Sequence, residues 1–117
     1  MVDPILLFKQ WLSEAEKKEI RDPNAMQIAT VSKNGMPSVR TVLLKDIIDG
    51  NFVFYTNYES RKSNEISETG KAAICFYWKS LNRQVRLVGN IGNPLLSEKK
   101  INKKTIFVIE ASSYQLD

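Results

Sequence analysis

Hydrophobic residues near the start of the chain recur at helical spacing. Phe8, Trp11 and Ala15 fall on one face of a helix, and lysines and a glutamate follow at its polar end. Asp3 supplies a capping side chain directly before Pro4, and proline suits the first helical position. These features predict an amphipathic helix that packs on the domain. A helix lying on a membrane surface is a second interpretation, which the mixed charges disfavour.

Beyond the helix-breaking residues 22–24, apolar and polar residues follow the pattern of strands separated by turns. Asn34-Gly35 and Asp49-Gly50 mark two of the turns. We expect Asn34 and Gly35 to take the two positive-φ positions of a tight hairpin. Turn residues divide the region into five predicted strands: Met26–Val31, Ser38–Lys45, Asn51–Thr56, Ala72–Trp78 and Arg83–Ile91.

The remaining segments complete the predicted outline. Ser60–Ser67 and Ser97–Lys104 are compatible with short helices, and Thr105–Glu110 fits either a sixth strand or an extended arm. Five closely spaced strands joined by hairpin turns favour an antiparallel sheet curled into a small barrel. We therefore predict a mainly β fold with flanking helices, in one domain over residues 1–117. A five-stranded barrel would leave strand edges that a partner could cover.

Composition narrows the chemistry that this domain can perform. The 117 residues include no histidine and one cysteine, which excludes histidine triads, zinc constellations and an intramolecular disulfide. No run of about 20 apolar residues and no signal-peptide pattern is present, so we predict a cytoplasmic protein without a membrane partner. The net charge of +4 allows an anionic partner without identifying it.

Several common binding motifs are absent from the sequence. Its five glycines form neither the Rossmann nor the P-loop motif. Cys75 lies among apolar residues, so we expect a small core hydrophobe without chemistry. The aromatic residues Phe52, Phe54, Phe76, Tyr77 and Trp78 are expected in the core or a dimer interface. Because cations do not alternate with them, a nucleic-acid-binding module is the weakest alternative, and we predict no nucleic-acid partner.

One polar cluster lies on the second predicted strand. Arg40 and Lys45 bracket the run Thr41–Leu44, and their odd spacing sends the two cations to opposite faces of a regular strand. They would then contact different ligands, or different ends of one ligand. A solvated edge strand explains the same pattern without any ligand.

Two further clusters could hold an anion and a heterocycle. Arg61 and Lys62 fall in the first turn of an expected helix, where cations oppose the helix dipole unless a bound anion offsets them. Gln84, flanked by Arg83 and Arg86 in a predicted strand, can both donate and accept hydrogen bonds at the edge of a heterocycle. For all three residues, exposure to water is the alternative interpretation.

Taken together, these residues resemble the pyridoxamine 5′-phosphate oxidase family. The motifs are Asp3-Pro4 with its helix, Ala29–Val31 with the Asn34-Gly35 turn, Arg40–Lys45, Phe54–Asn57 with Ser60–Lys62, and Arg83–Val85. They occur in order between residues 3 and 89, and RTVLLK combined with FYTN and SRK is highly specific. The resemblance implies an FMN-binding split β-barrel that forms a homodimer with the flavin at the subunit interface.

The resemblance also implies roles for individual residues. The implied FMN-binding residues are Arg40, Thr41, Val42, Leu43, Leu44, Lys45, Tyr55, Thr56, Arg61, Lys62 and Gln84. Lys45 would also bind the phosphate of the substrate, pyridoxamine or pyridoxine 5′-phosphate. In this family of vitamin B6 enzymes, the 4′ amine or alcohol is oxidised by hydride transfer to FMN, and oxygen reoxidises the flavin. No residue of the chain is assigned as a catalytic acid, base or nucleophile.

The resemblance ends near Gly89. Residues 90–117 form a divergent tail without the family's later substrate-binding and flavin-binding motifs, which suggests a member truncated at its C-terminus. Three hypotheses follow: a reduced but working oxidase, a non-catalytic FMN-binding remnant without a substrate site, and a chain that no longer holds FMN tightly. The sequence leaves enzymatic activity open among them.

Overall fold

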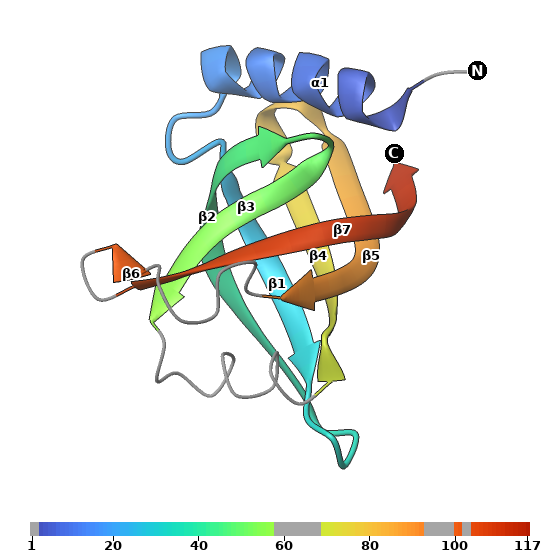
Figure 1. Cartoon of the computed structure of the whole chain (residues 1–117). Coiled ribbons are helices and arrows are strands. Elements are labelled where there is room, and N and C mark those ends of the chain that lie inside the picture. Colours follow the sequence, from blue (N-terminus) through green and yellow to red (C-terminus); the bar gives the residue numbers. More distant parts are fainter. Residues whose placement is uncertain (1–2, 58–68, 93–99, 102–103) are drawn as a thin grey trace.

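The computed structural model describes residues 3–57, 69–92, 100–101 and 104–117. Within these residues the chain forms one α-helix, then four strands, a 3₁₀ turn and three further strands. Figure 1 shows their arrangement. Their bounds are α1 Pro4–Lys18, β1 Ala25–Val31, β2 Pro37–Ile48, β3 Asn51–Asn57, β4 Lys71–Trp78, η1 Lys79–Leu81, β5 Arg83–Gly92, β6 Lys100–Ile101 and β7 Lys104–Leu116. The predicted mainly β class is therefore confirmed.

Six of these strands close into an antiparallel barrel. Their order is β3-β2-β1-β4-β5-β7, and β7 pairs with β3 as well as with β5. The barrel fold is thus confirmed, and the segment 105–110 belongs to a sixth barrel strand. The prediction of a five-stranded barrel with free edges is wrong, because β7 covers the edges of both β3 and β5. In Figure 1 this strand runs across the front of the barrel.

Helix α1 covers one end of the barrel (Figure 1). Its start follows the predicted capping pattern: Asp3 Oδ1 accepts a hydrogen bond from the Ile5 N–H at 2.9 Å, and Pro4 opens the helix. Phe8 and Ala15 are fully buried on its inner face. The amphipathic pattern therefore reports packing on the barrel. No helix in the described part of the chain is long and apolar enough to cross a membrane.

Aromatic side chains fill the end of the barrel beneath α1. The Phe8 ring lies 5.1 Å from Phe52, 4.9 Å from Phe76 and 5.8 Å from Trp78, measured between ring centroids. Such tilted and edge-to-face pairs add stabilisation to the buried apolar area. Trp78 Nε1 donates to the Pro23 carbonyl oxygen at 2.7 Å, which satisfies its one polar group. The helix is therefore part of the same core as the strands.

The two predicted turns differ in conformation. Asp49 and Gly50 both have positive φ, at 52° and 78°, and form the expected two-residue hairpin between β2 and β3. In the β1–β2 loop only Gly35 has positive φ, at 85°, so the prediction for Asn34 is wrong. The Ser32 N–H bonds to the Met36 carbonyl there, closing a longer loop with glycine in the left-handed position.

Two predicted helices have different outcomes. The first, Ser60–Ser67, lies outside the described residues. The second, Ser97–Lys104, is wrong where the structure describes it, because Lys100 and Ile101 form β6 and Lys104 begins β7. Lys100 pairs with Thr105 and Ile101 with Lys104. Cross-strand backbone pairing thus replaces the local helical hydrogen bonds that the polar composition favoured.

Candidate functional site

Outward-facing side chains of β1, β2, β4 and β5 form a hollowed face of the barrel wall. Thr41 pairs with Gln27, and Gln27 pairs with Cys75, so these three polar side chains form a row across β2, β1 and β4. A groove of about 460 Å³ is lined here by Ala25, Gln27, Thr41, Cys75, Tyr77 and Gln84. We call it the amide groove. It brings together Thr41 and Gln84, which are 43 positions apart in the sequence.

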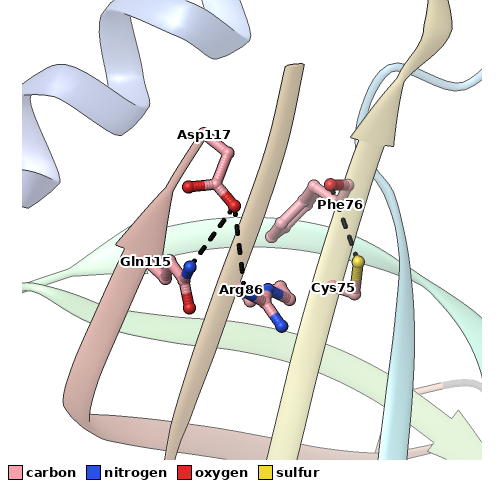
Figure 2. Close-up of polar contacts among 5 residues, drawn as sticks. All are labelled: Cys75, Phe76, Arg86, Gln115 and Asp117. Carbon is pink, nitrogen blue, oxygen red and sulfur yellow. Dashed lines mark hydrogen bonds and ion pairs between the residues drawn. The ribbon is translucent and has the colours of Figure 1, made fainter. Parts of the chain in front are cut away.

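Asp117, directly after β7, fixes the backbone of Gln84. The Gln84 N–H donates to the Asp117 carbonyl at 3.0 Å, and the Asp117 N–H donates back to the Gln84 carbonyl at 2.8 Å. The Asp117 carboxylate also lies 3.8 Å from Arg86 NH2 and accepts a hydrogen bond from Gln115 Nε2 at 3.5 Å (Figure 2). The divergent tail therefore contributes directly to the surroundings of a predicted site residue.

Cys75 corrects a prediction. It alternates along β4 with the buried Ile74 and Phe76, so it faces outward and is partly buried, and it does not belong to the core. Burial raises the pKa of its thiol, while the positive charge of Arg86 on β5 acts in the opposite direction. Tyr77 follows the same alternation and is exposed, so it is not a core residue either. The apolar neighbours in sequence were misleading because they point inward.

Lys45 lies in a different hollow. It stands at a bulge in β2, where the pairing with β3 shifts between Leu44 and Asp46. A hollow of about 510 Å³ between α1 and this end of β2 is lined by Lys45 together with Lys9, Glu16 and Asp46. These two lysines and two acids carry balanced formal charges. The structure therefore separates Lys45 from the amide groove that holds Thr41 and Gln84.

A sequence model of the family described as "Pyridoxamine 5′-phosphate oxidase" matches residues 12–110. The chain belongs to the pyridoxamine 5′-phosphate oxidase family. It is 57% identical over 89 residues to the pyridoxine/pyridoxamine 5′-phosphate oxidase of Agrobacterium fabrum, covering 76% of this chain and 43% of that protein. The corresponding enzyme of Sinorhizobium fredii is 56% identical over the same length, with the same shares covered. The chain thus spans less than half the length of the curated relatives it matches.

Solved structures with the same fold bind different molecules according to their descriptions. PhzG from Burkholderia lata, in complex with tetrahydrophenazine-1-carboxylic acid, has a TM-score of 0.83 at 21% identity, over 97% of this chain and 79% of that one. A pyridoxamine 5′-phosphate oxidase-related, FMN-binding protein from Nostoc punctiforme scores 0.76 at 15%, over 93% and 82%. The heme storage protein HutZ from Vibrio cholerae scores 0.71 at 9%, over 94% and 90%. At these identities the similarity shows the fold alone.

In this member of the pyridoxamine 5′-phosphate oxidase family, the β2 motif alternates between core and surface. Val42 and Leu44 are buried in the core, so a cofactor contact there would come from the backbone. Thr41, Leu43 and Arg40 are exposed. Arg40 pairs with Ile28 and belongs along β2 to the same alternating set of positions as the buried Val42 and Leu44. Thr41 lies between these positions and faces the amide groove. Adjacent residues of this motif therefore point in different directions from β2.

The β3 part of the family motif is described only in part. Tyr55 and Thr56 lie in β3, where their backbones pair with Ile106 and Thr105 of β7. Arg61 and Lys62 lie outside the described residues. The predicted roles of these four motif residues at FMN stay predictions.

Arg83, which belongs to the same family motif as Gln84, has a structural role. Its NH1 group donates to Glu14 Oε2 at 2.7 Å, and its guanidinium lies 4.6 Å from the centroid of the Trp11 ring. Glu19 at the end of α1 also accepts hydrogen bonds from the Ser80 N–H and hydroxyl. These contacts fasten α1 to the β4–β5 connection.

Sequence reasoning missed several polar residues on the hollowed face. Gln27, Arg86 and Gln115 share one cross-strand row with Thr41 and Cys75, although they come from separate strands. The alternation of side chains along each strand predicts only that each of these residues faces outward from its own strand. Their juxtaposition depends on the register between strands, which no local pattern reports.

Proposed function

We propose that this chain is a pyridoxamine 5′-phosphate oxidase-like flavoprotein that binds FMN at the amide groove. The observation that carries the proposal is the meeting of Thr41 and Gln84 in this groove. Both residues belong to the set that the resemblance to the oxidase family implies for FMN binding. Membership in the oxidase family supports the same cofactor.

The groove has the chemistry that a flat heterocycle requires. The amides of Gln27 and Gln84 each offer a donor and an acceptor, which suits a ring edge with alternating carbonyl and nitrogen groups. Tyr77 presents an exposed aromatic side chain, and Ala25 leaves room beside it. Exposed Arg40 is one of the cations proposed for the phosphate, together with Arg61 and Lys62. We therefore consider the residues compatible with FMN.

The proposed reaction oxidises the 4′ carbon of pyridoxamine or pyridoxine 5′-phosphate. When bound, FMN would supply the hydride acceptor, with oxygen as the final two-electron acceptor. With pyridoxamine phosphate, oxygen and water, the products are the aldehyde, ammonia and hydrogen peroxide. Lys45 is the proposed contact for the substrate phosphate, where a compact ammonium provides charge and hydrogen-bond donors. The relatives that are 56–57% identical bear the name of this activity.

A non-catalytic FMN-binding protein is the alternative, because the matched region spans 43% of the length of these relatives. Heme is a weaker candidate, since this sequence offers no histidine as an axial ligand. We further propose that the chain acts as a homodimer in the cytoplasm, with its one cysteine reduced. A monomeric mass in solution would contradict the dimer.

Flavin fluorescence tests cofactor binding directly. Titration with FMN should give saturable quenching in the micromolar range or below. Gln84→Ala should weaken FMN affinity about two- to tenfold, the effect of one lost hydrogen bond. Gln10→Ala, at an exposed glutamine on α1, is the matched control and should leave the affinity unchanged. No saturable quenching by the unaltered chain would refute the proposal.

Two further measurements separate the alternatives. FMN-saturated protein mixed with pyridoxamine 5′-phosphate should release the aldehyde and an equal amount of peroxide if it is an oxidase. Saturable FMN binding without either product would support the non-catalytic alternative. Arg61→Ala combined with Lys62→Ala should weaken FMN binding, and unchanged affinity would remove both from the phosphate site. Saturable binding of hemin without saturable binding of FMN would indicate heme as the ligand and refute the flavin.

A further inference from the structure

The end of β7 runs antiparallel to the start of β5, and their pairing reaches Gln84. Arg86 pairs with Gln115, and the same register two residues further places Asp117 opposite Gln84. Two backbone hydrogen bonds join this last pair: the Gln84 N–H donates to the Asp117 carbonyl at 3.0 Å, and the Asp117 N–H donates to the Gln84 carbonyl at 2.8 Å. The pairing therefore includes Asp117, directly after the end of β7 at Leu116.

Asp117 satisfies both backbone polar groups of Gln84. In an antiparallel sheet the N–H and C=O of one residue point to the same neighbouring strand. Those of Gln84 therefore point to β7 and away from Tyr77, its pairing partner on β4. Gln84 also lies at the start of β5, two positions after Asn82, whose φ is 51°. Because strand ends open more readily than strand centres, the two bonds to Asp117 determine how firmly this backbone is held.

The carboxylate of Asp117 contributes less than its main chain. It lies 3.8 Å from Arg86 NH2 and accepts a hydrogen bond from Gln115 Nε2 at 3.5 Å (Figure 2). The side chains of Arg86 and Asp117 are 49% and 53% exposed, and an ion pair this exposed adds little stability. The main-chain bonds therefore hold Gln84, and the carboxylate can be changed without loosening it.

We infer that Asp117 is a positioning residue for FMN and that it acts through Gln84. Gln84 lines the amide groove, and a fixed backbone keeps its amide at one place in that groove. A contact that is held in place before binding loses less conformational entropy when the ligand arrives. The inference rests on the proposed function for its ligand, and it gives a role to a residue of the divergent tail. The hold of Asp117 on Gln84 can be measured without FMN.

Two substitutions of Asp117 separate its main chain from its carboxylate. Asp117→Pro removes the N–H that donates to the Gln84 carbonyl. Asp117→Asn keeps this N–H and removes only the charge. FMN titration should show about two- to fivefold weaker affinity for Asp117→Pro, as expected for one lost hydrogen bond, and the parent affinity for Asp117→Asn. Unchanged affinity in Asp117→Pro, or an equal loss in both variants, would overturn the inference.

A double-mutant cycle tests whether Asp117 acts through Gln84. In the Gln84→Ala background, Asp117→Pro should leave the remaining FMN affinity unchanged, because the side chain that Asp117 positions is gone. A merely structural role would weaken FMN binding by the same factor in both backgrounds. That result would also overturn the inference.

Hydrogen exchange of the flavin-free chain, followed by NMR, measures the hold on Gln84 directly. Its N–H should exchange slowly in the parent and in Asp117→Asn, and about fivefold or more faster in Asp117→Pro. If Asp117→Pro unfolds, the parent decides: a Gln84 N–H that exchanges as fast as in an unfolded peptide would overturn the inference. A parent chain that protects this N–H and fails to bind FMN would refute the proposed function while supporting the hold of Asp117 on Gln84, so the two failures are distinguishable.

Discussion

At Gly89 the backbones of β5 and β7 approach too closely to leave room for a side chain. The pairing between these strands shifts from Val88 opposite Ser113 to Gly89 opposite Ala111. A Cβ atom at Gly89 would lie 2.7 Å from the Ala111 Cα and 2.9 Å from the Glu110 carbonyl carbon, and closer still to the Glu110 oxygen. All three neighbours are backbone atoms, so no side-chain rotation can relieve the overlap. Gly89→Ala must therefore push the two strands apart.

The expected cost follows from this geometry. Overpacking costs about 1–3 kcal/mol, and a backbone hydrogen bond lost beside the bulge adds about 1 kcal/mol, for a total of about 2–4 kcal/mol. Gly92→Ala, on the same strand, is the matched control, because no described atom lies within 4 Å of its added Cβ. Its stability should stay within about 1 kcal/mol of the parent chain.

Urea unfolding followed by tryptophan fluorescence measures both variants, since Trp78 is buried beneath α1. Gly89→Ala should unfold at lower urea concentration, and its Tm should fall by roughly 8–16 °C. Equal stability of Gly89→Ala and Gly92→Ala would refute the close β5–β7 pairing, and with it the closure of the barrel by the tail.

Two further predictions concern the core and the thiol. Phe8→Ala should destabilise the fold by about 3–5 kcal/mol, because it removes a ring from the aromatic cluster under α1. Leu6→Ala, at an exposed position of the same helix, should cost under about 1 kcal/mol. Equal unfolding midpoints of the two variants would mean that α1 does not pack on the end of the barrel. Cys75 should react with iodoacetamide more slowly in the folded chain than in urea at pH 8, because burial raises its pKa. Arg86→Gln removes the opposing charge and should move the pH midpoint of alkylation upward; a downward shift would contradict this electrostatic effect.

Much of the fold could be predicted because its signals are local. Asp3 caps the helix by accepting a hydrogen bond from the N–H of Ile5, two positions later. Asp49-Gly50 closes a two-residue hairpin between adjacent strands. Such interactions need only neighbouring residues, so spacing along the chain reports them. The same reasoning failed at Asn34 and at Lys100, where loop length and cross-strand pairing decided the conformation.

The candidate site was less accessible to prediction. Resemblance to the family identified Thr41 and Gln84 singly, and the fold brought them into one groove. Neither resemblance nor periodicity identified Arg86 as a neighbour of Gln115. Cys75 was placed in the core because its sequence neighbours are apolar, yet its outward direction follows from strand alternation.

By itself, the sequence determined the helix, five strands, the family, and the types of side chain available for contact with a ligand. The tertiary structure decided that the divergent tail becomes the sixth barrel strand, and which polar side chains share one face. The physical reason is the distance along the sequence between the residues that make each contact. Capping and hairpin turns depend on contacts a few residues apart, whereas barrel closure and the row from Thr41 to Gln115 depend on register among strands distant in sequence.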